Sequence, residues 1–130
     1  MQNYFETDFV TTAYDKASHV IILKWKVAPT SVEFKEGLDS IISAMEHFKT
    51  GKLIADTTHL GVIHPEDQEW SATVWVQKAL KVGYSQIALI VPSDIFTQLS
   101  VEDTMNMNKD TLDILTAYFD TIEAAIDWIK

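Results

Sequence analysis

The segment between residues 56 and 70 holds most of the side chains that could do chemistry. The polar residues of the segment that we single out are Asp56, Thr57, Thr58, His59, His64 and Asp67. They follow a short apolar run at 52–56, which is typical of a buried parallel strand. Because ligands and partners of open α/β sheets meet the carboxyl ends of the strands, we expect these side chains at one such end.

Two interpretations of this segment stay open. It could form a small polar site, or a partner-docking loop beside a helix N-terminus able to hold an anion. It could also be ordinary turn chemistry, in which Asp and Thr side chains bond the nearby backbone.

Other catalytic and metal-binding patterns are missing from the sequence. His59 and His64 could join Glu66 or Asp67 around a metal, but HExxH or comparable spacing is absent, so we expect surface or capping histidines. The lack of cysteine excludes thiolate metal sites, disulfides and a cysteine nucleophile. Neither a GxSxG elbow nor a glycine-rich phosphate loop is present. We therefore predict a protein that is not an enzyme and uses no cofactor.

Length and charge narrow the partners. The 130 residues suit a single domain spanning 1–130. Nineteen acids oppose ten bases, all of them lysine, for a net charge of −9. An acidic chain without arginine is poorly suited to nucleic acid and is repelled by an anionic membrane surface. No apolar run approaches the roughly 20 residues of a membrane span, and the first residues lack the features of a secretory signal, so we expect a cytoplasmic protein.

The apolar spacing predicts an opening hairpin followed by alternating helices and strands. The expected strands are 4–14, 19–27, 52–56, 86–91 and 112–119, and the expected helices are 31–49 and 65–82. A final helix is expected after a capped start at 120–123, with a buried stripe of Ile122, Ala125, Ile126 and Ile129. Thr30 and Glu33 form a capping-box pattern, and Pro65 suits the first turn of a helix. The stretch 93–110 is irregular, with one or two helical turns at 100–103. We predict an α/β fold with a mixed sheet of about five strands and three to four helices in a single layer.

This order of elements resembles the SpoIIAA-like, or STAS, fold of anti-sigma-factor antagonists, and more closely the small bacterial SpoIIAA-like proteins. The resemblance is carried by residues 22–25 (ILKW), 52–56 (KLIAD), 66–70 (EDQEW) and 118–128 (YFDTIEAAIDW). It implies a regulatory, protein-binding module in which Asp56 ends the third strand. The family's phosphorylatable serine would fall near His64 and Pro65, where this chain has no hydroxyl residue, so the usual phospho-switch is not expected.

Trp70 is the residue that helical spacing leaves furthest from the core. At about 100° per residue, the core-facing side holds Ala72, Trp75, Val76, Ala79, Leu80 and Gly83. Trp70 and Val74 fall on the opposite, polar side of the helix. A tryptophan that is exposed to solvent there lowers the solubility of the protein unless something covers it. Either the stretch 93–110 or the loop 57–64 covers Trp70, or Trp70 anchors an interface.

Two functions follow as hypotheses. The first is a non-enzymatic module that binds a protein partner or a second copy of itself as a dimer, through Asp56, Thr57, Thr58, His59, His64 and Trp70. The second is a binder of small apolar ligands or lipids. Its pocket would lie between the second helix, the stretch 93–110 and the sheet, lined by Trp70, Trp75, Phe96 and Met105.

Overall fold

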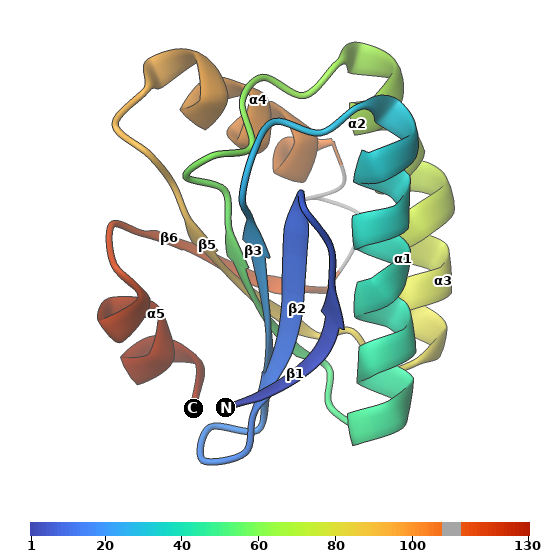
Figure 1. The fold of residues 1–130 in the computed structure, drawn as a ribbon, viewed down its shortest axis with the longest axis vertical. Helices are drawn as coiled ribbons and strands as arrows, with labels where there is room; N and C mark the ends of the chain where they lie inside the picture. The colour runs from blue at the N-terminus through green and yellow to red at the C-terminus, as the bar shows by residue number, and fades with distance from the viewer. Residues whose placement is uncertain (108–112) are drawn as a thin grey trace.

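A six-stranded mixed sheet forms the centre of the molecule in a computed structural model that describes residues 1–107 and 113–130 (Figure 1). The strands are β1 (Gln2–Glu6), β2 (Val10–Asp15), β3 (Val20–Trp25), β4 (Lys52–Asp56), β5 (Gln86–Ile90) and β6 (Leu115–Phe119). They lie side by side in chain order. β1 pairs with β2 and β2 with β3 in antiparallel fashion, whereas β3, β4, β5 and β6 run parallel to one another. The α/β fold predicted from the sequence is confirmed.

The sheet has six strands because the predicted strand 4–14 is two strands. The Thr7 hydroxyl accepts hydrogen bonds from the backbone nitrogens of Phe9 (3.2 Å) and Val10 (3.1 Å). This local turn reverses the chain, so β1 pairs antiparallel with β2. The β-rich composition of the segment hid the turn, since Phe, Val, Thr and Tyr all suit a strand.

The helices begin and end close to their sequence signals. They are α1 (Ser31–Phe48), α2 (Pro65–Trp70), the π-helical turn η1 (Ser71–Trp75), α3 (Val76–Lys81), α4 (Ile95–Asn106) and α5 (Ile122–Ile129). The capping box of Thr30 and Glu33 is present, and Pro65 occupies the first turn of α2. Helical dihedrals continue through both junctions of η1, so α2, η1 and α3 form one continuous helix.

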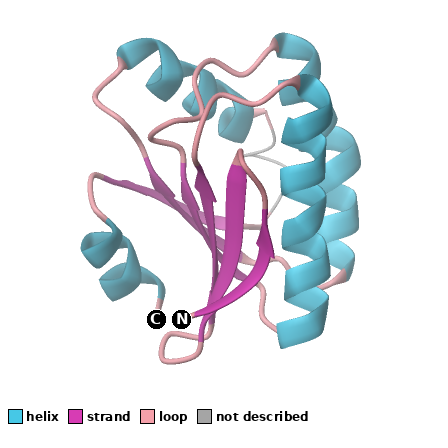
Figure 2. Cartoon of the chain, in the orientation of Figure 1, coloured by secondary structure: helices cyan, strands magenta, loops and turns pink. Residues whose placement is uncertain are grey.

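Helices cover both faces of the sheet, so the predicted single helical layer is wrong. Figure 2 shows α1 and α3 on one face and α5 on the other. The strands explain this, because β3, β4 and β5 are apolar on both faces. One set of buried side chains packs under α1 and α3 in the larger core, and the second set packs with α5. The second core consists of Val20, Ile22, Ile54, Ala88, Ile90, Ala125 and Ile129.

The stretch predicted to be irregular contains α4, a helix of 12 residues. Asp94 caps it by accepting from the Phe96 nitrogen (3.2 Å) and the Thr97 hydroxyl (2.7 Å). Only three residues of α4 are buried: Thr97, Ser100 and Val101. With two of these three polar, the apolar period that marks a helix is missing from the sequence. Residues 108–110 of the predicted stretch, and residue 112 of the predicted last strand, lie outside the described residues.

Candidate functional site

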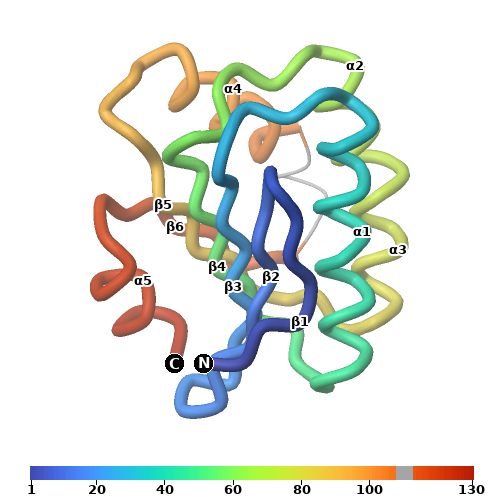
Figure 3. The backbone as a smooth tube through the Cα atoms, viewed as in Figure 1, coloured from blue at the N-terminus to red at the C-terminus, as the bar shows by residue number. Residues whose placement is uncertain are grey.

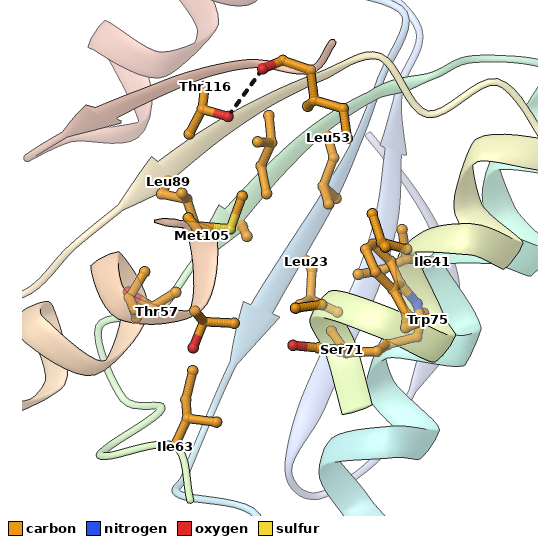
Figure 4. Close-up of a pocket in the computed structure, with 18 of the residues that line it drawn as sticks. Leu23, Ile41, Leu53, Thr57, Ile63, Ser71, Trp75, Leu89, Met105 and Thr116 are labelled. Carbon is orange, nitrogen blue, oxygen red and sulfur yellow. Dashed lines mark hydrogen bonds between the residues drawn. The ribbon is translucent and has the colours of Figure 1, made fainter. Parts of the chain in front are cut away.

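A cavity of about 470 Å³ lies inside the larger core, between the sheet and the helices α1, α3 and α4 (Figure 4). Side chains from β3, β4 and β5 form its floor, and η1, α3 and α4 close it from above. Its apolar lining is Leu23, Trp25, Phe34, Leu38, Ile41, Leu53, Ala55, Leu60, Ile63, Ala72, Trp75, Val76, Ile87, Leu89, Val101, Met105, Ile114 and Leu115. Its polar lining is Thr57, Ser71, Tyr84, Thr104, Asn106, Thr116 and Tyr118. Cavities of roughly 300–1,000 Å³ with this composition are typical of small-ligand sites.

The carboxyl ends of the parallel strands lie next to the cavity. α2 and α4 contact each other there, as Figure 3 shows in the backbone tube. Ile63, in the loop before α2, donates its backbone nitrogen to the Ser100 hydroxyl of α4 at 3.2 Å. This bond fixes the loop 57–64 against α4, so both elements contribute to the cavity wall.

The π turn η1 belongs to this wall. The Val76 nitrogen donates to the Ser71 oxygen, five residues back, where an α-helix would bond four residues back. Ser71 and Val76, the two residues of this bond, both line the cavity. Single π turns inside α-helices are rare and often lie at functional sites. The local backbone therefore departs from regular helix at the cavity.

Most polar side chains of the wall already bond to the protein backbone. The donor and acceptor pairs are Thr57 Oγ1 to Ile90 O (2.8 Å), Ser71 Oγ to Gln68 O (2.9 Å), Thr104 Oγ1 to Ser100 O (2.7 Å) and Trp75 Nε1 to Leu38 O (2.7 Å). These hydrogen bonds satisfy the polar side-chain atoms, which therefore need no partner inside the cavity. They leave the wall apolar in effect, since a hydroxyl that bonds its own backbone offers little to a ligand.

Tyr84 differs from these polar groups. It is 4% exposed, and its ring meets the edge of Trp75 with centroids 5.4 Å apart. Its hydroxyl makes no hydrogen bond to a described residue. Burial, with a smaller contribution from Tyr118, raises the pKa of Tyr84 well above its ordinary value, so the phenol keeps its proton.

The cavity reaches the surface beside β6. Its exposed lining residues are Asn106, Leu115, Thr116 and Tyr118, whereas Leu23, Ile41 and Leu53 are fully buried at its other end. Thr116 and Tyr118 pair in register with Ile87 and Leu89 of β5, so they share the cavity face of the sheet. Partial burial, and then Glu102, raise the pKa of Tyr118.

The predicted polar segment is divided by the structure. Asp56 accepts from both the backbone nitrogen (3.0 Å) and the hydroxyl (2.6 Å) of Thr58, which is the geometry of turn chemistry. Thr57 turns inward and lines the cavity. His59 and His64 are exposed, and His64 precedes α2 without a side-chain cap bond. Among the described residues, no group of three or more His, Asp or Glu side chains could hold a metal ion.

The structure divides the four residues that were predicted to line a pocket. Trp75 and Met105 line the cavity, but Trp70 and Phe96 do not. Phe96 is 70% exposed, because the side chain of α4 that turns inward beside it is Thr97. Trp70 is half-buried at the rim of the larger core, and the Lys35 ammonium of α1 lies 5.5 Å from the centre of its ring. α1 therefore gives Trp70 a contact that was expected from the loop or from residues 93–110.

Most of the wall was missed as a site because its residues were interpreted as ordinary core. Leu23, Leu53, Leu89, Trp75 and Met105 all line the cavity (Figure 4). An apolar residue that lines a cavity and one that fills a core have the same pattern in sequence. The feature of the sequence that pointed most directly toward the cavity was Met105, in the stretch 93–110.

Comparisons with models of protein families, with curated proteins and with solved structures found no match to this chain. In the part of the chain that the structure describes, no helix is long and apolar enough to cross a membrane. The resemblance to SpoIIAA-like proteins therefore stays a prediction from the residues alone. The feature that distinguishes the molecule is an apolar cavity in its larger core, next to the carboxyl ends of the parallel strands of its mixed sheet.

Proposed function

We propose that the protein binds a small apolar molecule in the cavity of its larger core. The observation that carries this proposal is the cavity itself, with about 470 Å³ of space and a wall whose side chains are mostly aliphatic and aromatic. Protein interiors are close-packed, and their voids are rarely larger than a water molecule. A space of this size inside a 130-residue chain is large enough for a small apolar ligand.

The energy of an unfilled cavity supports the same conclusion. At about 24 cal/mol per Å³, a closed empty space of this volume would cost ~11 kcal/mol, which is an upper limit here because the cavity opens beside β6. That equals the whole free energy of unfolding of many domains, roughly 5–15 kcal/mol. Water gains little from such a wall, because most of its polar groups bond the backbone. An apolar ligand would restore the missing dispersion contacts and bury the wall from water.

The second candidate function is a non-enzymatic, cytoplasmic module that binds a protein partner or a second copy of itself. This function stays a prediction from the sequence. Asp56 and Thr58 bond each other, and His59 and His64 have no described contact that favours a partner. We rank ligand binding first because it has a specific structural feature behind it.

Two measurements test the proposal. Native mass spectrometry of the protein purified from its own host should show a retained small molecule. Titration with N-phenyl-1-naphthylamine, an uncharged dye that fluoresces in apolar surroundings, should show saturable binding to the delipidated protein. Val76→Trp places a large ring in the cavity and should weaken dye binding by about tenfold or more, because it takes up space the dye needs.

The matched control is Val74→Trp, two residues away. Val74 is 45% exposed and is not a lining residue, so this variant should bind the dye like the wild type. Equal weakening in both variants would trace the effect to the helix and not to the cavity. A bare protein mass together with no dye binding would overturn the proposal.

A further inference from the structure

Among the described residues of the buried cavity wall, one hydrogen-bond donor is unused. Thr57, Ser71, Thr104 and Trp75 each donate to a backbone oxygen. The Tyr84 hydroxyl donates to no described residue, although Tyr84 is more than nine-tenths buried. A phenol hydroxyl in an apolar wall gains free energy when it finds a hydrogen-bond partner.

The Tyr84 side chain belongs to the cavity wall. In the described part of the chain, every side-chain nitrogen or oxygen that is fully shut off from solvent has a hydrogen bond. The Tyr84 oxygen, which has none, therefore keeps some accessible surface. Tyr84 lines the cavity, so that surface is available to whatever occupies the cavity.

The wall is unsuited to a charged ligand. None of its described residues carries a charge at neutral pH, and the whole chain has a net charge of −9. A carboxylate or sulfonate inside would lack a cationic partner, and an ammonium would lack a carboxylate. Glu102, which acts on Tyr118 at the open end, adds to the repulsion of anions.

The phenol of Tyr84 is suited to donate. Burial raises its pKa, so it stays protonated across the physiological range. An uncharged acceptor oxygen satisfies it without bringing a charge into the apolar wall. A carbonyl oxygen does this best, because it offers lone pairs and no proton of its own that would need a second partner.

We propose that the ligand is an uncharged molecule with an apolar body and a carbonyl oxygen, of the ketone, ester or quinone type, which accepts a hydrogen bond from the Tyr84 hydroxyl. This inference rests on the proposed ligand-binding function and names its chemical class. Tyr84 acts as a specificity-determining residue: it orients the ligand, while the apolar wall supplies most of the contact.

Three fluorescent probes test the charge and the carbonyl separately. N-phenyl-1-naphthylamine is uncharged and has no carbonyl, and 1-anilinonaphthalene-8-sulfonate is the same molecule with a sulfonate added. 6-Propionyl-2-(dimethylamino)naphthalene is an uncharged ketone whose emission moves to the red when its carbonyl accepts a hydrogen bond. The wild type should bind the uncharged amine at least about tenfold more tightly than the sulfonate.

Tyr84→Phe removes the hydroxyl and keeps the ring. It should weaken ketone binding about three- to tenfold, move the bound ketone's emission to the blue, and leave binding of the amine within about twofold of wild type. Tyr14→Phe is the matched control, because the Tyr14 hydroxyl bonds His19 at 2.6 Å, outside the cavity lining, and should change none of the three affinities.

Each outcome decides. If Tyr84→Phe weakens the amine and the ketone equally, the hydroxyl has only a structural role. If the sulfonate binds as tightly as the amine, the uncharged class is wrong. If Tyr84→Phe does not fold, the wild type still decides: a bound ketone with the emission of an aprotic solvent refutes the hydrogen bond. If no probe binds the wild type, ligand binding itself has failed, which is distinct from every result above.

Discussion

The indole nitrogen of Trp75 donates a hydrogen bond to the main-chain oxygen of Leu38 at 2.7 Å, and this bond joins the π turn η1 to α1. Both residues line the cavity, so the contact fixes the spacing of the two helical elements of its wall.

Trp75→Phe should lower the free energy of unfolding by about 2 kcal/mol, because it removes this bond and part of a buried ring. Urea unfolding measures the loss. Trp70→Phe is the control, since Trp70 is half-buried and its indole nitrogen donates to no described residue. A loss of the same size in both variants would show that the bond to Leu38 contributes nothing.

Stability at alkaline pH should depend on Tyr84. Its pKa in the folded protein lies above the ordinary value of 10.0, so the folded state retains a proton that the unfolded state releases. The contribution is complete below about pH 10 and is lost as the pH rises further, by about 1.4 kcal/mol per pH unit. Tyr84→Phe should have a shallower alkaline decline in urea unfolding. Parallel declines in wild type and variant would contradict the raised pKa.

The cap of α4 should support ligand binding. Asp94→Ala removes the acceptor for the Phe96 nitrogen and the Thr97 hydroxyl. Fraying of this turn should displace the cavity residues of α4, so both the melting temperature and the affinity for N-phenyl-1-naphthylamine should fall. The two hydrogen bonds lower the pKa of Asp94, so the stabilisation is present above its ordinary value of 3.8 and is lost as the pH falls below it. Asp103→Ala, exposed on the same helix, should leave both quantities unchanged.

Gly51 should tolerate no side chain. A Cβ atom there would lie 1.8 Å from the Gly83 backbone oxygen, and the Ser85 nitrogen holds the strand in place by donating to the Gly51 oxygen at 2.9 Å. Gly51→Ala should therefore lower the free energy of unfolding by at least about 3 kcal/mol. Gly61→Ala is the comparison: it strains a positive φ of 75° but meets only the Ala28 methyl at 3.4 Å, and should cost roughly 1–2 kcal/mol. Equal losses would indicate that the backbone at Gly51 can move.

Strongly patterned elements were predictable from the sequence. Thr30 and Glu33 mark the start of α1, and the alternation of Ile21, Leu23 and Trp25 with Val20 and Ile22 places two apolar faces on β3. These signals are local and depend on backbone geometry alone. The full length of α4 was not predicted, because its buried positions include Thr97 and Ser100. The hydroxyls of these two residues bond within the helix and to the neighbouring loop. Their burial depends on partners distant in the chain.

The sequence by itself determined the parallel strands β4 and β5 and the helices α1, α3 and α5, because hydrophobic period and capping act over a few residues. The tertiary structure decided that the larger core is not full. Hydrophobicity says that Leu23, Leu89 and Met105 leave water, but only their positions in space say whether they touch one another or surround a void. The tertiary structure also decided that the Tyr84 hydroxyl has no hydrogen-bond partner among the described residues. The lack of a partner can be recognised only when the positions of the neighbouring atoms are known.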